Sequence, residues 1–434
     1  MTETPIINHL PVQLRADPAR VVLRPFIPAD DPLPPGSSIA TRAQGLAGRV
    51  MALPQRDLDE ELTRVIVSMT DRHRNVEKVL MRRFQEVNGS LFAALTASTP
   101  QALLIGAYFC EEYSFEAAAL FNPSIVAHPD QTNLGGGAIR FILSLRGVGE
   151  GHVSSITFRT GIYRANETMV VDAPSLQAIS PRIDIIPDRI PDDPAVRLSC
   201  AEETHDLSEI VIFPITFLQR HGIEDLRLVR FVDDDDAVTY LGTYTAFSGE
   251  DIREELLSTT DFATFNLKAL RGSAASNKGM ALFPRRIGGQ YAMLGRLDHE
   301  NIWLLRSDDL YHWDKGTMIL APRWVWEFVQ LGNCGSPIEI DEGWLVLIHG
   351  VGPVRNYCIG ACLLDKADPT KVLGRLAAPL LRPSPVERDG YVPNVIYSCG
   401  ALLSGRTLIL PYAVADSFTT IATISVDALL AAME

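Results

Sequence analysis

Residues 221–247 read "HGIEDLRLVRFVDDDDAVTYLGTYTAF". Two segments, in which apolar and polar residues alternate as in β-strands, flank a run of four aspartates. This pattern predicts an antiparallel hairpin with a solvated acidic turn. Glu224, Asp225 and Arg227 stand at the start of the first strand. Alternation places Asp225 and Arg227 on one face, where the arginine can order the carboxylate. These residues alone leave two interpretations open: an active site, or a salt bridge that caps a hairpin.

Similar strand pairs recur along the chain, with a spacing of roughly 50 to 60 residues. They are "GQYAMLGRL" (289–297) with "NIWLLRSDDLYHW" (301–313), "GWLVLIHGV" (343–351) with "YCIGACLLDKADP" (357–369), and "RTLILPYAVADS" (406–417) with "TTIATISVDAL" (419–429). Repeats of about four antiparallel strands are typical of a β-propeller, and counting the strands of 121–175 as the first blade gives five. A β-sandwich is the alternative, but it does not explain why the second strand of each unit ends in a similar segment.

Residues 1–120 have a different pattern. After a Pro-rich arm, apolar residues recur at helical spacing at Leu58, Leu62, Val65, Met69, Val76, Leu80, Phe84 and Val87. Asp57 is the expected N-cap, Gly89 the expected stop, and a further helix is expected over 100–120. We therefore predict an all-β, five-bladed propeller over 121–434, preceded by a helical extension over 1–120. The helix face of 72–83 is basic, which is usual for a solvated face, and a homo-oligomer contact through these helices is the functional alternative.

Charge and composition narrow the functional classes. The chain has 434 residues, 47% of them hydrophobic, and 53 acidic against 39 basic residues give a net charge of -14. This excess of acidic residues argues against a nucleic-acid or anionic-membrane partner. The N-terminus lacks a basic region followed by an apolar one, and no stretch approaches 18 apolar residues, so we expect a cytoplasmic protein.

Several common site motifs are missing or lack their context. The six cysteines show no CxxC spacing, so we expect buried thiols and no metal site. "GVGEG" (147–151) lies between strands without a following helix, which excludes a dinucleotide site there. No GxSxG or HExxH motif occurs, and no cofactor is expected.

Polar side chains near the predicted strand ends favour a sugar ligand, because carboxylates and guanidinium groups bind hydroxyls and a carboxylic acid can protonate a glycosidic oxygen. These residues are Asn122, Arg146, Asp225, Asn277, Lys278, Arg296, His349, Asn394, Tyr412 and Asp416.

Several motifs, in order, resemble glycoside hydrolase family 130. "GIEDLR" resembles the family's "G-[IV]-E-D-P-R", and "NKGMALFPRRIGGQYAMLGR" resembles "K-D-x-x-L-F-P…Y-x-M-x-H-R". "GWLVLIHGV", "DPTKVLGRLAAPLL", "GYVPNVIYSCGAL" and "PYAVAD" are similar to its later blades. The resemblance covers about 121–434. It implies inverting β-mannoside phosphorylases or β-1,2-mannosidases on a five-bladed propeller, with N-terminal helices that take part in oligomer contacts in some subgroups.

The resemblance also implies roles for individual residues. Asp225 matches the general acid, which is thought to protonate the leaving oxygen through a hydroxyl of the mannose. Arg146 and Asp416 match residues that hold the sugar in the cleavage subsite. Asn122 lies in the matching loop of the first blade, and Glu224 and Arg227 would support the acid.

The chain departs from the family pattern at three positions. Leu226 replaces the signature proline, Gly279 replaces the aspartate of Lys-Asp, and Gly295 replaces the histidine of His-Arg. A phosphorylase needs cations to hold phosphate, because a desolvated dianion is costly unless it is paired. Lys278 and Arg296 remain for that purpose, with inorganic phosphate as co-substrate.

Hydrolysis requires a different group. An inverting hydrolase needs a second carboxylate roughly 6.5 to 9.5 Å from the acid, to act as base on water. Glu300, Asp298 and Glu116 are the candidates, although each can equally be a surface or loop carboxylate. Because the histidine is absent, we expect hydrolysis slightly ahead of phosphorolysis of β-1,2- or β-1,4-mannosides. A non-catalytic sugar-binding propeller is a third possibility, which the joint presence of Asp225, Arg146 and Asp416 opposes.

Overall fold

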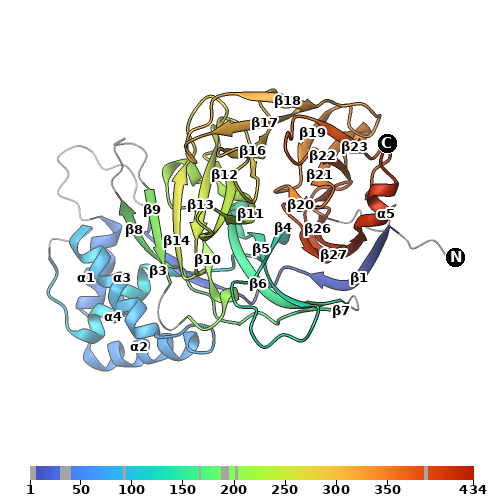
Figure 1. Ribbon diagram of the computed structural model, residues 1–434. Coiled ribbons are helices and arrows are strands. Elements are labelled where there is room, and N and C mark those ends of the chain that lie inside the picture. Colours follow the sequence, from blue (N-terminus) through green and yellow to red (C-terminus); the bar gives the residue numbers. More distant parts are fainter. Residues whose placement is uncertain are drawn as a thin grey trace. The chain divides into compact units, whose positions relative to one another are not determined.

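The computed structural model describes residues 6–29, 41–90, 94–165, 168–186, 195–200, 204–385 and 390–434 (Figure 1). The Pro-rich arm lies partly outside these residues. The chain forms two compact units. The smaller unit contains Pro18–Phe115 and Ser175–Ser180, and the larger contains Met1–Asp17, Glu116–Pro174 and Pro181–Glu434. The expected division at residue 120 stays a prediction, but strand β1 lies in the larger unit although it falls within the range assigned to the helical extension.

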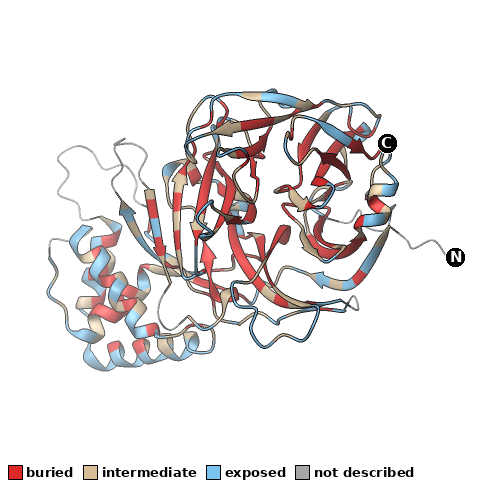
Figure 2. Cartoon of the chain, viewed as in Figure 1, coloured by how far each residue is buried: buried red, intermediate tan, exposed pale blue. Residues whose placement is uncertain are grey.

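The smaller unit is built from helices and one strand pair. Its helices are α1 (Arg42–Met51), α2 (Gln55–Met69), α3 (Val76–Ser90) and α4 (Thr99–Tyr108), and strand β2 (Val22–Pro25) pairs with β3 (Cys110–Tyr113). Figure 2 shows helices with buried residues on one side and exposed residues on the other. A Cβ atom at Gly106 would lie 2.0 Å from the carbonyl oxygen of Leu80. Helices α3 and α4 therefore meet at close backbone contact, which only glycine permits there.

Helical periodicity located α2, α3 and α4 but not their ends, and it did not predict α1. Helix α2 begins at Gln55 behind Pro54, so Asp57 lies in the first helical turn and is not the N-cap. Gly89 lies inside α3, which ends at Ser90. The helix expected over 100–120 ends at Tyr108, because the following residues pair as β3 with β2. Long-range strand pairing here outweighs local helical preference.

The larger unit is made almost entirely of antiparallel strands. One eleven-stranded sheet has the order β4-β5-β6-β11-β12-β13-β14-β9-β8, with β7 and β10 on β6. Its strands are β4 (Ala119–Ala127), β5 (Ala138–Val148), β6 (Ser154–Arg164), β7 (Thr168–Val171), β8 (Arg182–Ile186), β9 (Ala195–Ser199), β10 (Val211–Ile212), β11 (Gly222–Val232), β12 (Val238–Phe247), β13 (Ile252–Thr259) and β14 (Thr264–Ala269). Strands β6 and β11 meet in parallel at one pair, Gly222 and Ser154.

Three further sheets complete this unit. The first is β15 (Ala281–Leu282), β16 (Tyr291–Gly295), β17 (Ile302–Ser307) and β18 (Gly316–Leu320). The second is β19 (Gln330–Asn333), β20 (Ile338–Ile340), β21 (Gly343–Gly352), β22 (Asn356–Leu364) and β23 (Val372–Arg375). The third is β1 (Ile7–Leu14), β24 (Ile396–Tyr397), β25 (Leu402–Ser404), β26 (Thr407–Val414) and β27 (Phe418–Ser425), followed by α5 (Val426–Ala431). The predominantly β fold expected from the alternation is confirmed, except that 426–431 is a helix and not the end of a strand.

The acidic hairpin is present as predicted. Strands β11 and β12 pair antiparallel from Gly222–Phe247 to Val232–Val238. In the turn, residues 234–236 are exposed, whereas Asp233 accepts a hydrogen bond from Arg286 Nε at 2.6 Å. The turn is therefore solvated, as expected, but one of its carboxylates is anchored to a neighbouring segment.

All six cysteines are free thiols; Cys110 and Cys200 are only partly buried, and the other four are buried. Among the residues that the structure describes, no helix is long and apolar enough to cross a membrane.

Candidate functional site

Two β-bulges turn Asn122 and Asp225 toward each other. The register of β4 on β5 shifts between Phe121 and Ser124, and that of β11 on β12 shifts between Glu224 and Arg227. Asn122 has φ 48° and Asp225 has φ 56°, a left-handed conformation that Asn and Asp tolerate better than most residues. Asn122 Nδ2 donates a hydrogen bond to Asp225 Oδ1 at 2.6 Å. Bulges of this kind re-aim side chains beside active sites.

Arg146, on β5, links both carboxylates of β11. Its Nη2 donates to Glu224 Oε1 at 2.7 Å, and its Nη1 lies 3.5 Å from Asp225 Oδ1. The side chains are largely buried, with 18% of Arg146 and 14% of each carboxylate residue exposed. Lys278 Nζ lies 3.5 Å from Glu224 Oε2. Four candidate residues from three separate segments therefore form one ion-paired cluster.

Among the described residues, no hydrogen bond joins the Arg227 side chain to the Asp225 carboxylate, which it was expected to order. Arg227 Nη1 donates to the backbone oxygen of Asp225 at 3.1 Å, and its Nη2 donates to the hydroxyl of Tyr397 at 2.6 Å. The bulge is the reason, because it interrupts the two-residue alternation on which the expectation rested. Arg227 still acts on Asp225 through its charge.

The pKa values of two carboxyl groups of the site, Asp225 and Asp416, are shifted in opposite directions. Burial favours the neutral form of Asp225, but Arg146, Arg227 and the Asn122 hydrogen bond outweigh it and hold the pKa of Asp225 below its usual range. Asp416 lies in the turn between β26 and β27 with φ 49°. Burial, followed by the negative charge of Asp225, raises the pKa of Asp416 to about 6. The free site therefore holds an ionised Asp225 beside a carboxyl group that titrates near neutrality.

Replacing Asp416 by asparagine should stabilise the protein in a pH-dependent way. The pKa of Asp416 rises from 3.8 to about 6 on folding, so the folded state disfavours its charged form. This penalty is absent below the unfolded pKa and complete above the folded one. We expect Asp416→Asn to raise the free energy of unfolding by about 2–3 kcal/mol at pH 8 and not near pH 4. Urea unfolding at both pH values tests this, with the exposed Asp234→Asn as control, and an equal change at both values would contradict it.

His349 is a buried, neutral ring near Arg296 and Arg227. Burial, followed by the positive charges of Arg296 and Arg227, lowers its pKa to about 3. Its ring stacks on Tyr357 at 5.8 Å between centroids and lies 5.0 Å from the Tyr397 ring. His349 therefore supplies shape and not positive charge.

The two cationic residues expected to bind phosphate are Lys278, which precedes β15, and Arg296, which follows β16. Arg296 Nε and Nη2 each lie 3.4 Å from the backbone oxygen of Lys278, to which they donate. Asn277 Nδ2 donates to the backbone oxygen of Leu297 at 3.1 Å, so it joins the two segments. These contacts place Lys278 and Arg296 next to Glu224 and the acid cluster.

Two predicted binding residues have other contacts. Tyr412, on β26, is buried in the core, and its hydroxyl lies 3.0 Å from His9 Nδ1. Asn394, with φ 65°, accepts a hydrogen bond from Tyr357 N at 2.9 Å through its backbone oxygen.

Two of the three candidate bases, Glu116 and Asp298, are engaged in structural contacts. Glu116 is fully buried and accepts two hydrogen bonds from Arg159 Nη2, at 3.0 and 2.9 Å. Asp298 caps its own turn through Glu300 N and Asn301, and these hydrogen bonds lower its pKa to about 2 although burial acts in the opposite direction. Glu300 is exposed in the same turn. No hydrogen bond or ion pair of Asp298 or Glu300 within the described residues reaches Asp225.

Sequence reasoning missed three residues of the site, of which Asn333 and Glu254 are buried and Tyr397 is half-buried. Tyr397 binds Arg227, Asn333 Nδ2 donates to Gly279 O at 2.6 Å, and Glu254 accepts from Gly279 N at 2.8 Å. "IREELL" gave no signal for Glu254, because adjacent charged residues in a strand usually indicate a solvated edge.

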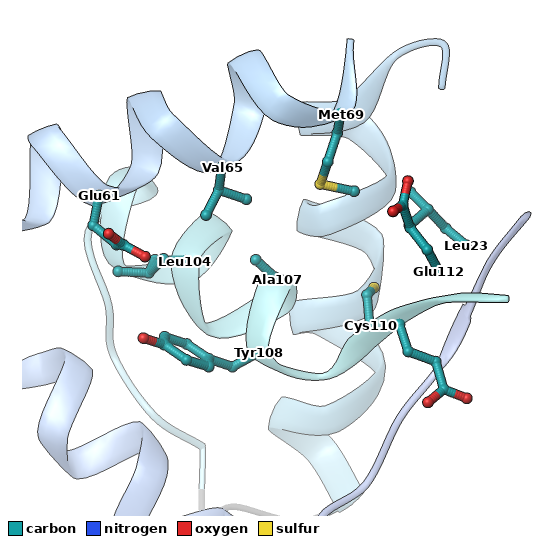
Figure 3. A pocket seen from close by; sticks show the side chains of 10 residues that line it. Leu23, Glu61, Val65, Met69, Leu104, Ala107, Tyr108, Cys110 and Glu112 are labelled. Carbon is teal, nitrogen blue, oxygen red and sulfur yellow. The ribbon is translucent and has the colours of Figure 1, made fainter. Parts of the chain in front are cut away.

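A hollow of about 240 Å³ lies in the smaller unit, between α2, α4 and the β2–β3 pair (Figure 3). Its carboxylates are already paired, Glu61 with Arg64 and Glu112 with Arg72 and His73. None of the residues of the Asp225 cluster lines this hollow.

The family assignment follows from a sequence profile. A family described as beta-1,4-mannooligosaccharide phosphorylase matches residues 197–434, more than half of the chain and the part that carries Asp225, Lys278, Arg296 and Asp416. The chain belongs to glycoside hydrolase family 130. Its family is thus one of carbohydrate-active enzymes, as the sequence motifs indicated.

Individual relatives agree with this assignment. A 1,2-beta-oligomannan phosphorylase of Thermoanaerobacter sp. is 35% identical over 206 residues, 46% of this chain and 67% of the relative. A beta-1,2-mannobiose phosphorylase of Listeria innocua is 32% identical over 232 residues, 51% of this chain and 64% of the relative. These matches span about two thirds of the relatives' own lengths. Both relatives are phosphorylases, which favours phosphorolysis over the hydrolysis expected from the sequence.

Solved structures share the fold. The beta-1,2-mannobiose phosphorylase from Listeria innocua, in complex with beta-1,2-mannobiose, superposes with a TM-score of 0.50 at 24% identity, covering 73% of this chain and 92% of that chain. At this identity the likeness concerns the fold alone.

Proposed function

We propose that this protein is an inverting β-mannoside phosphorylase that releases α-mannose 1-phosphate. The observation that carries the proposal is the position of Lys278 and Arg296, two cations linked to each other and, through Glu224, to Arg146 and Asp225. A site that accepts a phosphate dianion needs such paired positive charge. The phosphorylase relatives support the same conclusion.

In the proposed reaction, a phosphate oxygen attacks the anomeric carbon while the glycosidic bond breaks, and the leaving oxygen takes a proton that originates from Asp225. Arg146 and Asp416 hold the mannose. Asp225 is ionised in the free site, so it must take up one proton from solvent when substrates bind, and the proton carried by the attacking phosphate returns to solvent as the product becomes a dianion. A phosphate dianion provides the reason, because its negative charge opposes the arginines that hold the pKa of Asp225 low.

We propose that five blades surround this site. The single parallel pair between β6 and β11 divides the eleven-stranded sheet into two groups, and three further sheets follow. The first group contacts the last sheet, since Leu120 N donates to Ser417 O at 3.0 Å and Cys399 N donates to Pro123 O at 2.8 Å. These contacts, together with the pairing of β1 with β27, support a closed ring.

The rate of mannoside cleavage should depend on phosphate in a saturable way. We expect no turnover without phosphate, and Lys278→Ala should raise the KM for phosphate by about 10-fold, because one charged hydrogen bond is lost. The KM for the mannoside should change little. Initial rates with β-1,2-mannobiose and with β-1,4-mannobiose, over a range of phosphate concentrations, test both points and show which linkage is used.

Lys371→Ala is the matched control, because Lys371 is an exposed lysine paired only with Asp368 at 3.5 Å among its described ion pairs. Turnover at the same rate with and without phosphate would reject the phosphorylase proposal in favour of hydrolysis.

A further inference from the structure

Glu254 is a buried carboxyl group beside the proposed phosphate site. It lies on β13, is fully buried, and its Oε1 accepts hydrogen bonds from Thr245 Oγ1 at 2.9 Å and from Gly279 N at 2.8 Å. Its Oε2 is buried and has no hydrogen-bond partner among the described residues. A buried carboxyl group with one unsatisfied oxygen costs stability, so its presence here indicates a role other than packing.

The Gly279 N–H belongs to the same peptide unit as the Lys278 carbonyl group. Glu254 holds the N–H end of this peptide, and the Arg296 guanidinium donates to the carbonyl end from Nε and Nη2, each at 3.4 Å. One peptide plane therefore connects the Glu254 carboxyl group to the Arg296 side chain. Rotation of this plane would remove the acceptor that orients Arg296.

The next peptide is also held. Asn333 Nδ2 donates to Gly279 O at 2.6 Å, so both sides of Gly279 are fixed. Gly279 has φ 95°, a conformation that L-residues rarely adopt, and a Cβ atom there would lie 3.5 Å from Arg296 Nε and 3.9 Å from Arg227 Nη2. Without a side chain of its own to hold it, this residue depends on Glu254 and Asn333 for its orientation.

The hydrogen bond between Glu254 and Gly279 N does not depend on the protonation state of Glu254. Burial is the main cause that raises the pKa of Glu254, while Arg227 and the hydrogen bonds from Gly279 and Thr245 act in the opposite direction. Either protonation state can accept the Gly279 hydrogen bond through Oε1, so the positioning contact does not require a charged Glu254.

We propose that Glu254 is a positioning residue that sets phosphate affinity, by fixing the Lys278–Gly279 peptide and through it Lys278 and Arg296. This inference rests on the proposed phosphorylase function. Glu254 itself touches neither phosphate nor sugar.

Phosphate affinity of single variants tests the inference. We expect Glu254→Ala to weaken the calorimetric Kd for inorganic phosphate about 10-fold or more, with the KM for the mannoside nearly unchanged. Glu254→Gln should bind phosphate almost as tightly as the wild type, because its amide oxygen still accepts from Gly279 N. A general loss of structure would affect mannoside and phosphate together.

Glu255→Gln is the matched control. Glu255 is the next residue on β13, is also buried, and bonds Gln219, Tyr244 and Arg253 on the opposite face of the strand. We expect this variant to lose stability while its phosphate Kd stays unchanged. Asn333→Ala removes the other restraint on Gly279 and should also weaken phosphate binding, which provides a second test if Glu254→Ala does not fold.

The outcomes separate the two claims. If the wild type does not bind phosphate, the phosphorylase function is rejected and this inference with it. If the wild type binds phosphate, and either Glu254→Ala or Asn333→Ala binds it equally well, the positioning role alone is overturned. Equal weakening in Glu254→Gln and Glu254→Ala would likewise overturn positioning, since only the charge would then matter.

Discussion

Asp225→Asn should lower kcat by about 10²–10⁴-fold, the usual contribution of a general acid. The KM for the mannoside should change little, because asparagine has the same shape and its Oδ1 can still accept the hydrogen bond from Asn122 Nδ2. Steady-state kinetics at saturating phosphate measure both constants.

A substrate with a different leaving group shows whether the Asp225→Asn variant has lost only its general acid or has a distorted site. An aryl mannoside whose leaving group is a weakly basic phenolate needs little protonation, so Asp225→Asn should slow it much less than mannobiose. Equal losses with both substrates would show that Asp225 acts by binding or shape and would reject its role as acid.

Arg146→Met should lower the free energy of unfolding by about 3 kcal/mol and also abolish most activity. Removing one partner of a buried ion pair typically costs about 3–5 kcal/mol, and the lower end applies because 18% of the Arg146 side chain is exposed. Methionine keeps the length of the side chain but leaves Glu224 and Asp225 without their shared cation. Urea unfolding at pH 7 measures the change.

The pH dependence of this loss has a defined sign. Arg146 is the largest charge that lowers the pKa of Asp225, so the stability it provides is present above the ordinary pKa of 3.8 and disappears as the pH falls through the folded pKa. The gap between wild type and variant should therefore narrow below about pH 4. Arg140→Met is the control, because Arg140 lies on the same strand in an exposed pair with Asp130 and should cost less than about 1 kcal/mol. A similar loss in both variants would contradict a special role for Arg146.

The sequence predicted the strands and the acid cluster because their signals are local. Alternation located β11 and β12, and the ordered motifs pointed to Asp225 together with Arg146 and Lys278. The contacts of the cluster were not predictable, because they depend on bulges. The bulge at Asp225 adds one residue to β11 and interrupts the alternation of side chains between the two faces. No residue type in "GIEDLR" predicts this bulge.

Long-range pairing accounts for the other misses. Residues 7–14, "INHLPVQL", contain Pro11, which argues against a strand. They nevertheless form β1 on β27, and Pro11 lies where the register shifts between His9 and Gln13, so the missing N–H is tolerated. Glu254 resembled a surface residue because its hydrogen-bond donor, Gly279, lies 25 positions away along the chain.

The most direct test of the account is the fate of phosphate during turnover. We would follow wild-type protein with β-1,2-mannobiose and inorganic phosphate by ³¹P NMR, with Asp225→Asn as the blank. We expect the phosphate signal to be replaced by that of α-mannose 1-phosphate, in an amount equal to the mannose released from the leaving side. Two free mannoses for each disaccharide, with the phosphate signal unchanged, would contradict it.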